Sequence, residues 1–305
     1  MPETHDIFAA LADPTRLRIL LLVRDLELAM GELADVLGQS QPRVSRHVRI
    51  LAEAGLVNRH KEGAWVFVGP GSTVPHEELY ALLDRLLAGQ DLCATERTRL
   101  QQVRTDRQKA VDDWFQANAA EWDLMRRLEG ADAGVDRVLV DCATRERDVG
   151  RLLDIGTGTG RILELLLPHA SHAIGIDRSP EMLRLARAKL DAGNVEVRQA
   201  DMRVLPFDAC TFDTVVMHQV LHFADDPAGV VAEAARVLGP KGRLLIVDHA
   251  AHTHEELRSR FQHLRLGFDE PAVSGWMAAA GLSSSVAARA VGPEITSILW
   301  EGQRP

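Results

Sequence analysis

The feature that most constrains the fold is a glycine-rich segment, RLLDIGTGTGR, at residues 151–161. An apolar run ends in Asp154, glycines follow at the alternate positions 156, 158 and 160, and a helix-like segment begins at Ile162. This order predicts a strand that turns sharply into a helix. Because glycine permits backbone conformations that other residues avoid, a bulky ligand can lie against the main chain of this turn.

The spacing of these glycines limits which ligand the turn can hold. A dinucleotide fingerprint reads Gly-x-Gly-x-x-Gly, but here the third glycine comes one residue early and Arg161 stands in the place of a small residue. Nicotinamide and flavin are therefore disfavoured. Asp177 closes a second apolar run (172–176), where a carboxylate can accept both hydroxyls of a ribose. Asp201 follows a third run (195–199) and is placed to meet an adenine edge.

Five segments in a fixed order carry a resemblance to a known family. They read LLDIGTGTGR, GIDRSPEML, QADMRVLPF, FDTVVMHQVLHF and ARVLGPKGRLLIVD. Over about residues 110–305 the chain resembles the class I S-adenosylmethionine-dependent methyltransferases, in particular the ubiquinone-methyltransferase-like branch. The resemblance implies a Rossmann-like α/β fold with a seven-stranded sheet. It also implies S-adenosyl-L-methionine as the cofactor and S-adenosyl-L-homocysteine as its product.

The same resemblance implies a role for each matched position. Asp154 and the glycines would hold the methionine part of the cofactor, and Asp177 would hold the ribose. Asp201 and Met202 would face the adenine, while residues 218–219 would form the wall beyond the fourth strand. The predicted cofactor site comprises Asp154, Gly156, Thr157, Gly158, Gly160, Asp177, Arg178, Met182, Asp201, Met202, His218 and Gln219.

Composition narrows the class of protein. At 305 residues, two domains are the better expectation, and either is large enough to bury a core. Three widely spaced cysteines indicate a reducing compartment and no disulfide scaffold. The chain shows no leader-like start and no apolar run near about 18 residues, so we expect a cytoplasmic protein without a membrane span. A formal net charge of −9 confines nucleic-acid binding to a local patch.

Such a patch lies near the amino terminus. Two short helical segments, 29–37 and 42–54, are separated by residues 38–40, which predicts a helix-turn-helix. The second segment has an apolar stripe opposite a basic face. Residues 56–68 form two short strand-like runs about a polar turn, which is typical of a wing. Between residues 40 and 62 five Lys or Arg stand against two Glu, and phosphate contacts and base reading both need such a positive surface.

These segments resemble the ArsR-type winged-helix repressors over about residues 3–88. The resemblance implies a double-stranded DNA operator as partner and a homodimer formed through the first and last helices, about residues 7–11 and 75–87. The predicted DNA contacts are Gln41, Arg43, Ser45, Arg46, His47, Arg49, Arg59 and Lys61. The alternative is a helix-turn-helix used only as a protein contact. Metal-sensing members carry Cys-x-Cys where this chain has Ala29-Met30-Gly31, so no metal site is expected.

The order of these segments predicts three parts: a winged-helix domain (1–88), a connecting helix (89–110) and a methyltransferase domain (111–305). The connecting segment is polar and rich in Arg, without glycine after its first residue, which favours a helix over a flexible tether. The third part begins with a sequence that resembles a lid helix and contains Trp114 and Trp122. These aromatics either pack in a core or touch a substrate.

The residues that would carry the chemistry are less constrained. Methyl transfer from a sulfonium has an excellent leaving group, so a protein supplies alignment and sometimes a base. His222 and His249 follow or end predicted strands on the ligand side, and either can accept a proton from a hydroxyl or amine. The histidines within residues 248–254 have a spacing typical of an exposed loop, which disfavours a metal cluster. Cysteines at 93, 142 and 210 do not match the converging thiols of arsenic methylation, which stays an outside alternative.

Two functions follow from these segments. In the first, a transcriptional regulator carries a working enzyme that methylates a small molecule, and substrate or product tunes DNA binding. In the second, the methyltransferase domain has lost catalysis and acts as a repressor's sensor of S-adenosylmethionine or S-adenosylhomocysteine. Both need cofactor binding, so the glycine turn and its acids fit either. The group His218, His222 and His249 slightly favours catalysis.

Overall fold

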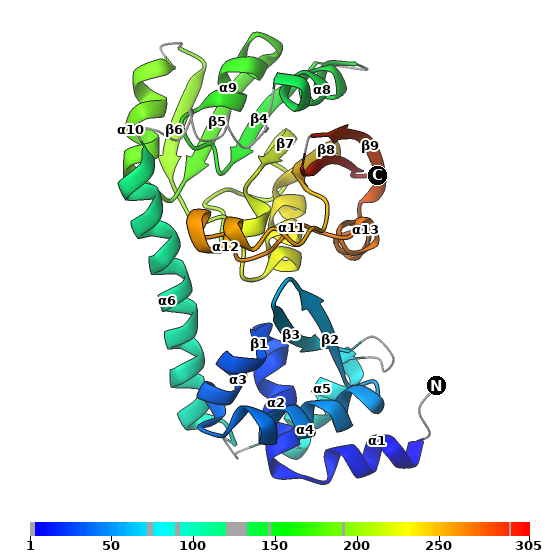
Figure 1. Cartoon of the computed structure of the whole chain (residues 1–305). Helices are drawn as coiled ribbons and strands as arrows, with labels where there is room; N and C mark the ends of the chain where they lie inside the picture. The colour runs from blue at the N-terminus through cyan, green and yellow to red at the C-terminus, as the bar shows by residue number, and fades with distance from the viewer. Residues whose placement is uncertain are drawn as a thin grey trace. The chain divides into compact units, whose positions relative to one another are not determined.

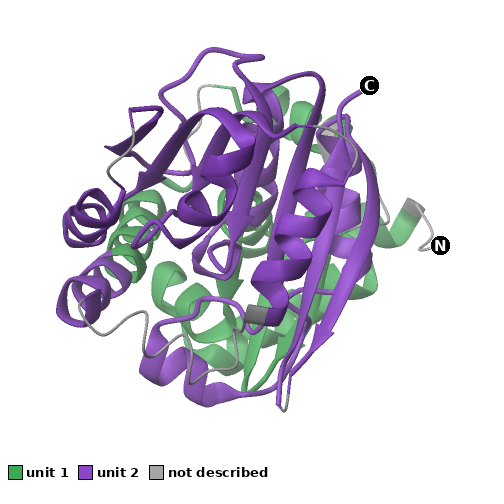
Figure 2. Ribbon diagram, turned by 90° about the horizontal axis from the view of Figure 1, so that it is seen from above, with its two compact units in different colours: residues 1–108 green, residues 109–305 purple. Residues whose placement is uncertain are grey.

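The computed structural model describes residues 4–71, 76–88, 92–119, 133–145, 148–190, 193–292 and 294–305. The chain divides into two compact units, residues 1–108 and 109–305, which are labelled by element in Figure 1 and coloured separately in Figure 2. The fold predicted from the sequence is confirmed, with a winged helix-turn-helix in unit 1 and a seven-stranded Rossmann-like sheet in unit 2. Within the described ranges, no helix is both long enough and apolar enough to cross a membrane.

Unit 1 is mostly helical, with a small sheet. Its elements are α1 (Thr4–Leu11), α2 (Pro14–Asp25), β1 (Leu28–Ala29), α3 (Met30–Leu37), α4 (Gln41–Glu53), β2 (Val57–Glu62), β3 (Trp65–Pro70) and α5 (His76–Leu86). Asp13 caps α2, because its Oδ1 accepts the backbone N–H groups of Thr15 and Arg16 at 2.8 and 3.1 Å. Gly38 ends α3 in a left-handed conformation (φ +63°) that favours glycine.

The core of unit 1 holds α4 in place. Val44, Val48 and Leu51 are fully buried, so the apolar stripe predicted for this helix is confirmed. Strands β2 and β3 form an antiparallel hairpin, and β1 pairs with the other edge of β3. The helix-turn-helix (α3 and α4) is therefore followed directly by a wing.

Helix α6 (Ala94–Asn118) is a single helix of 25 residues that includes the end of unit 1 and the start of unit 2. Its sequence has neither glycine nor proline, so nothing in it interrupts the helix. In unit 1, Arg107 of this helix pairs with Glu32 of α3, with 2.8 Å between Nε and Oε1. Trp122 of the predicted lid sequence lies outside the described residues.

Unit 2 is built on one sheet with the strand order β6-β5-β4-β7-β8-β10-β9. The strands are β4 (Gly150–Ile155), β5 (Ala170–Asp177), β6 (Val195–Gln199), β7 (Phe212–His218), β8 (Leu238–His249), β9 (Ser283–Val291) and β10 (Thr296–Gln303). The helices are α8 (Ala133–Thr144), α9 (Arg161–Leu166), α10 (Pro180–Lys189), α11 (Pro227–Val237), α12 (Glu255–Phe261) and α13 (Glu270–Ala279), with short 3-10 helices η2 (Leu167–His169) and η3 (Leu221–Phe223). The first five strands in this order pair in parallel, and β10 is antiparallel to both of its neighbours.

Helices cover both faces of this sheet. Leu152 and its neighbours pack against α8 and α9, while Leu153 faces the opposite layer with α11 and α13, because successive side chains of a strand alternate between faces. The strand order reverses between β4 and β7, where β5 follows β4 on one side and β7 lies on the other. In doubly wound sheets ligands bind at such a switch point, outside the carboxyl ends of the strands.

Candidate cofactor site and nucleic-acid interface

The glycine turn lies at this switch point, between β4 and α9. Gly156, Gly158 and Gly160 have φ values of +74°, +53° and +82°, which only glycine adopts readily. A Cβ on Gly156 would come within 2.3 Å of a methyl carbon of Val220. The backbone N–H groups of Gly156 and Thr157 donate to the carbonyl of Ile176 at 2.8 and 2.9 Å. The turn is therefore fixed against the end of β5. Its three glycines have no side chains.

Asp177, at the end of β5, is bound to this turn. Its Oδ2 accepts the N–H of Gly158 at 2.9 Å, and its Oδ1 accepts the N–H of Ser179 at 2.8 Å. Burial raises the pKa of Asp177, and the backbone hydrogen bonds reduce that rise. The acid predicted for ribose binding and the glycine turn thus form one hydrogen-bonded unit.

Asp201 follows β6 and is held by two cations. Arg203 donates to both of its carboxylate oxygens, at distances from 2.7 to 3.2 Å, and Arg178 lies 3.5 Å from Oδ2. Burial opposes ionisation of this carboxyl, but the hydrogen bonds from Arg203 outweigh it, so the pKa of Asp201 is lowered. An adenine contact by Asp201 stays a prediction, and it would have to share the carboxylate with Arg203.

A hollow of about 440 Å³ opens beside Asp201, within the size range of small-molecule sites. It is lined by Asp112, Gln116, Arg178, Ser179, Pro180, Glu181, Gln199, Ala200 and Asp201. Arg178, which follows β5, contacts α6 across this hollow, because one of its guanidinium nitrogens lies 2.9 Å from the carboxylate of Asp112. The sequence did not single out Asp112 or Gln116, since only the fold brings α6 to the carboxyl ends of β5 and β6.

The remaining predicted cofactor residues lie along the same edge of the sheet. Asp154, at the end of β4, and Thr157, in the turn, are both buried, as is Met182 in the first turn of α10. Met202 is half-buried and packs against the core. Gln219 has a positive φ of +54°, and its amide lies 3.3 Å from the Ser297 hydroxyl.

His218 ends β7 and faces an acid that the sequence did not reveal. Its Nε2 lies 3.5 Å from Oδ1 of Asp136 in α8, which is 4% exposed. Arg161, at the start of α9, donates to the other oxygen of Asp136 at 3.1 Å. Asp136 therefore connects the helix after the glycine turn with the end of β7. No sequence spacing signals this contact, because α8 precedes the sheet and lies far from both partners along the chain.

The two predicted catalytic histidines belong to one buried cluster with a third histidine. His222 lies on η3, His249 ends β8, and His263 follows α12; their exposed fractions are 2%, 6% and 2%. The ring centroids of His222 and His249 are 5.4 Å apart, and the His263 ring lies 3.9 Å from that of His222. Asp248 accepts a hydrogen bond from Nδ1 of His222 at 2.7 Å. Burial lowers the pKa of His249 to about 3.

The chain after β8 folds back over this cluster. The N–H groups of Leu264 and Arg265 donate to the carbonyl of His222, each at 3.1 Å, and the N–H of Phe268 donates to the carbonyl of His249 at 2.9 Å. The expectation that the histidines of residues 248–254 lie in an exposed loop is therefore wrong for His249. The sequence did not reveal His263 as a member of the cluster, because the chain reaches the cluster there by folding back after α12 and not by a recognisable residue spacing.

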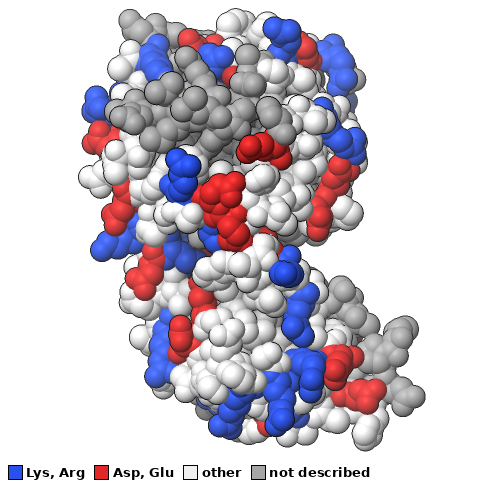
Figure 3. All heavy atoms as spheres, in the orientation of Figure 1, with Lys and Arg blue, Asp and Glu red and all other residues white. Residues whose placement is uncertain are grey.

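The basic face of α4 is largely exposed in unit 1. Gln41, Arg43, Arg46 and Arg49 are exposed, and Ser45 is half-buried. No described residue forms a salt bridge with Arg43 or Arg46, whereas Arg49 lies 3.8 Å from Glu53. Figure 3 shows Lys and Arg side chains grouped on this face of unit 1, in the region of α4 and the wing.

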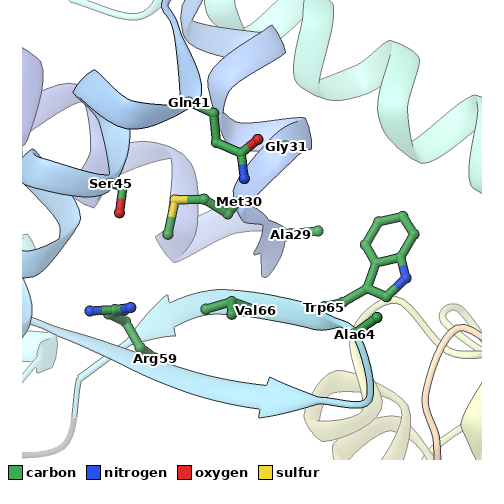
Figure 4. Close-up of a pocket in the computed structure, with 9 residues that line it drawn as sticks. All are labelled: Ala29, Met30, Gly31, Gln41, Ser45, Arg59, Ala64, Trp65 and Val66. Atoms are coloured by element: carbon green, nitrogen blue, oxygen red, sulfur yellow. The ribbon is translucent and has the colours of Figure 1, made fainter.

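The wing adds two exposed cations, Arg59 and Lys61, which also make no salt bridge with the residues described. A hollow of about 350 Å³ separates the wing from α3 and α4 (Figure 4). It is lined by Ala29, Met30, Gly31, Gln41, Ser45, Arg59, Ala64, Trp65 and Val66. Three predicted DNA contacts thus border one hollow, although they come from two different elements.

His47 is placed differently from the other predicted DNA contacts. Its side chain is 14% exposed, and its Nδ1 lies 3.8 Å from Oδ1 of Asp13, the residue that caps α2. Burial lowers the pKa of His47 despite this acid. The side chain turns toward α2, so its contact with DNA stays a prediction with less geometric support than that of Arg43 or Arg46.

Two known protein families match separate parts of the chain. Residues 13–59 match the family described as bacterial regulatory protein, arsR family. Residues 153–246 match the family described as methyltransferase domain. The first match covers the helix-turn-helix and the first strand of the wing as far as Arg59, and the second covers β4 to β8, with the glycine turn and the acids that follow it.

Individual relatives align with the second unit. The uncharacterized methyltransferase YcgJ of Bacillus subtilis is 32% identical over 158 residues, 49% of this chain and 61% of that protein. A demethylmenaquinone methyltransferase of Thermus thermophilus is 38% identical over 140 residues, 44% of this chain and 63% of that protein. The chain therefore spans less than two thirds of the length of these relatives.

Solved structures share the fold of unit 2. The crystal structure of YcgJ matches with a TM-score of 0.50 and 21% identity, covering 57% of this chain and 99% of that one. Magnesium protoporphyrin IX methyltransferase of Synechocystis, solved with bound S-adenosylhomocysteine, matches with a TM-score of 0.52 and 18% identity, covering 65% and 100%. At these identities the likeness is one of fold.

Proposed function

We propose, from the premise that the chain carries an arsR-family helix-turn-helix domain and a methyltransferase domain, that it is a DNA-binding transcriptional regulator whose second domain uses S-adenosylmethionine to methylate a small molecule. The observation that carries this proposal is the hydrogen bond from the N–H of Gly158 to Asp177. This bond joins the glycine turn, which would hold the methionine part of the cofactor, to the carboxylate that would hold its ribose. Both lie at the switch point of the sheet, where such folds bind ligands.

The residues present fit this cofactor. Three glycines with positive φ leave the turn without side chains at these positions, and a hollow of small-molecule size is lined by Arg178 and Ser179, which directly follow Asp177. The two N–H groups bound to Asp177 orient its carboxylate but leave lone pairs on both oxygens, which suits the two hydroxyls of a ribose. When bound, the cofactor supplies a methyl group on a sulfonium that is already a good leaving group, so the chain's task is to bind and align.

We place the methyl acceptor beside the cluster of His222, His249 and His263. His222 follows β7, which is the neighbour of β4 and its glycine turn, and His249 ends β8, the next strand beyond β7. Their burial excludes bulk water, which keeps a reacting heteroatom from being solvated. The predicted catalytic role of His222 and His249 belongs to this proposal.

For unit 1, we propose that α4 enters the major groove of an operator. Arg43 and Arg46 then reach base edges, and Arg59 and Lys61 of the wing contact phosphates. A homodimer would bring two such helices to one palindromic site. Phe8 on α1, together with Leu82 and Leu86 on α5, is 65%, 42% and 66% exposed, which favours these two helices as the dimer surface.

A second function, sensing without catalysis, is favoured by α6. In unit 1 this helix carries Arg107, which pairs with Glu32 of the helix-turn-helix. In unit 2 the same helix carries Asp112, which pairs with Arg178 in the wall of the hollow. A ligand that breaks the ion pair between Arg178 and Asp112 would change a contact of α6, the helix that also holds α3 of the helix-turn-helix through Arg107.

The experiment that tests the cofactor proposal uses the full chain. Native mass spectrometry of the purified protein, followed by calorimetric titration with S-adenosylmethionine and S-adenosylhomocysteine, should show one site per chain. A second small molecule that travels with the protein and gains about 14 Da on incubation identifies the acceptor and a working enzyme. Cofactor binding with no acceptor consumed supports the sensor, and no binding of either ligand contradicts both functions.

A further inference from the structure

The histidine cluster has the spacing of a metal site. His222, His249 and His263 each offer one ring nitrogen, and these three nitrogens all lie within 4.8 Å of one another. A point about 2.8 Å from each nitrogen therefore exists, and Zn–N bonds of about 2.0–2.1 Å need side-chain shifts of less than about 1 Å. Ligation also requires the stacked rings of His222 and His263 to turn toward that point.

Each of the three histidines has a ring nitrogen without a hydrogen-bond partner in the described part of the chain. Nε2 of His222, Nδ1 of His249 and Nδ1 of His263 are all buried, and none has a hydrogen-bond partner there. A fourth buried nitrogen without a partner, Nε2 of His252, lies nearby, with its ring 5.8 Å from that of His249. Buried polar atoms are nearly always satisfied, so several unsatisfied ones at one place indicate a missing common partner.

The residue behind the cluster completes the pattern. Asp248 is fully buried and lies 2.7 Å from Nδ1 of His222, which donates to it and leaves the lone pair on Nε2. The same carboxylate accepts the N–H groups of His222 and His249 at 3.2 and 2.8 Å. A carboxylate that orients a histidine in this way is the usual outer partner of a metal-ligating imidazole.

We propose that His222, His249 and His263 bind one divalent transition-metal ion, with Zn²⁺ the best match. Imidazole ligands suit zinc, copper, nickel and iron, and the cluster contains no thiolate. Three imidazoles leave a tetrahedral ion one open position, as in catalytic zinc sites. A water molecule fills that position, or an acceptor's heteroatom does, and this last use rests on the proposed methyltransferase function. The sequence predicted no metal because the three histidines are spread over residues 222–263 and only the fold brings them together.

A direct test is metal binding by the full-length protein after chelator treatment. Titration with Co²⁺, followed by its visible d–d absorption, and displacement by Zn²⁺ should report about one four-coordinate site per chain with a Kd below about 1 μM. His263→Gln should weaken binding by at least about 100-fold, and Asp248→Asn by about 10–100-fold. His254→Gln is the matched control, because His254 belongs to an exposed group with Glu256 and Glu294 that also has metal-ligand spacing.

Two further measurements keep the result interpretable. Zn²⁺ should raise the thermal midpoint of the unsubstituted protein reversibly, and this shift needs no variant to fold. Calorimetric titration of the metal-free protein with S-adenosylmethionine tests the cofactor site separately, so failure of one proposal is distinguishable from failure of the other. The metal proposal is overturned if the unsubstituted protein binds no Co²⁺ or Zn²⁺ at about 10 μM, or if His254→Gln abolishes binding while His263→Gln does not.

Discussion

The basic surface of unit 1 and the carboxyl edge of the unit 2 sheet differ in how their charged groups are held. Arg43, Arg46, Arg59 and Lys61 are exposed and make no salt bridge within the described residues. At the carboxyl edge of the sheet, by contrast, Asp177 is tied to two backbone N–H groups, and the buried Asp248 is hydrogen-bonded to a buried histidine. One surface presents free charges to solvent, and the other holds its charges in a fixed network.

This difference predicts how each region responds to substitution. Exposed, solvated charges contribute little to folding, so removing one should change DNA affinity and leave the stability of the protein nearly unchanged. Charged groups at the carboxyl edge of the sheet are hydrogen-bonded to the residues around them. Changing one of them should therefore alter ligand affinity and the free energy of unfolding together. The predictions below test that contrast.

The largest effect is expected at the glycine turn. Gly156→Ala places a Cβ 2.3 Å from Val220 at a backbone angle of φ +74°. Backbone strain and overpacking should add, which lowers the free energy of unfolding by about 2–6 kcal/mol and removes detectable cofactor binding. Chemical denaturation and calorimetric titration measure the two effects. Gly134→Ala in α8, where the added Cβ meets nothing within 4 Å, is the control; it should leave cofactor binding unchanged and should not lower the free energy of unfolding.

The next effect is on cofactor affinity, and it should come with a lower free energy of unfolding, because Asp177 also accepts two backbone N–H groups. Asp177→Ala removes the proposed ribose acceptor and should weaken S-adenosylmethionine binding by about 1.5–3 kcal/mol, the usual loss for hydrogen bonds to a charged group. Calorimetric titration measures it against Asp148→Ala, which removes an exposed acid from the same unit. Equal affinities in the two variants would exclude Asp177 from the ribose role.

DNA recognition should respond to single exposed cations. Arg46→Ala should cost about 1–3 kcal/mol on the cognate operator and relax the preference at one base position in each half-site. Lys61→Ala should weaken cognate and random DNA alike and reduce the salt slope by about one. Gel shifts over a series of salt concentrations measure both, with Arg184→Ala on α10 as the control. A loss of folding stability in either DNA variant would contradict the contrast between the two regions.

The smallest effect is expected at the cap of α2. Asp13→Ala removes the acceptor of two backbone N–H groups and should lower the free energy of unfolding by about 0.5–2 kcal/mol. Burial opposes ionisation of Asp13, but the hydrogen bonds from Arg16 and Thr15 lower its pKa below 3.8. Its stabilisation is therefore present above that value and is lost as the pH falls through the lowered pKa. In thermal unfolding, Asp13→Ala should be less stable than the parent at neutral pH, and this difference should disappear in acid, whereas Asp6→Ala should match the parent throughout.

The sequence predicted the parts of each site that follow a local pattern. Residues 41–61 carry the proposed DNA surface on one helix and one hairpin, so helical spacing and turn residues are enough to predict its place. The glycine turn was found because three glycines must stand at fixed positions. His47 shows the limit of this approach, because the helical pattern places it outward while Asp13 holds it against α2.

What the sequence did not reveal depends on contacts between distant segments. Asp136 reaches His218 only because α8 packs on the sheet, and His263 joins the cluster only because the chain after α12 returns to β8. Asp112 faces Arg178 because α6 extends into unit 2 without a break. Each of these is a buried or partly buried polar group whose partner is set by tertiary packing, which residue spacing does not encode.

The central claim is that one chain binds operator DNA through α4 and S-adenosylmethionine through the glycine turn. Its most direct test is the fluorescence anisotropy of a labelled duplex from the region upstream of the chain's own gene, measured with the full-length protein at low salt. We expect saturable binding that weakens steeply with salt and shifts by about 5-fold or more when S-adenosylmethionine or S-adenosylhomocysteine is added, with no shift in Asp177→Ala. Absence of DNA binding with and without either ligand would contradict the account and leave unit 1 as a dimerisation module for an enzyme.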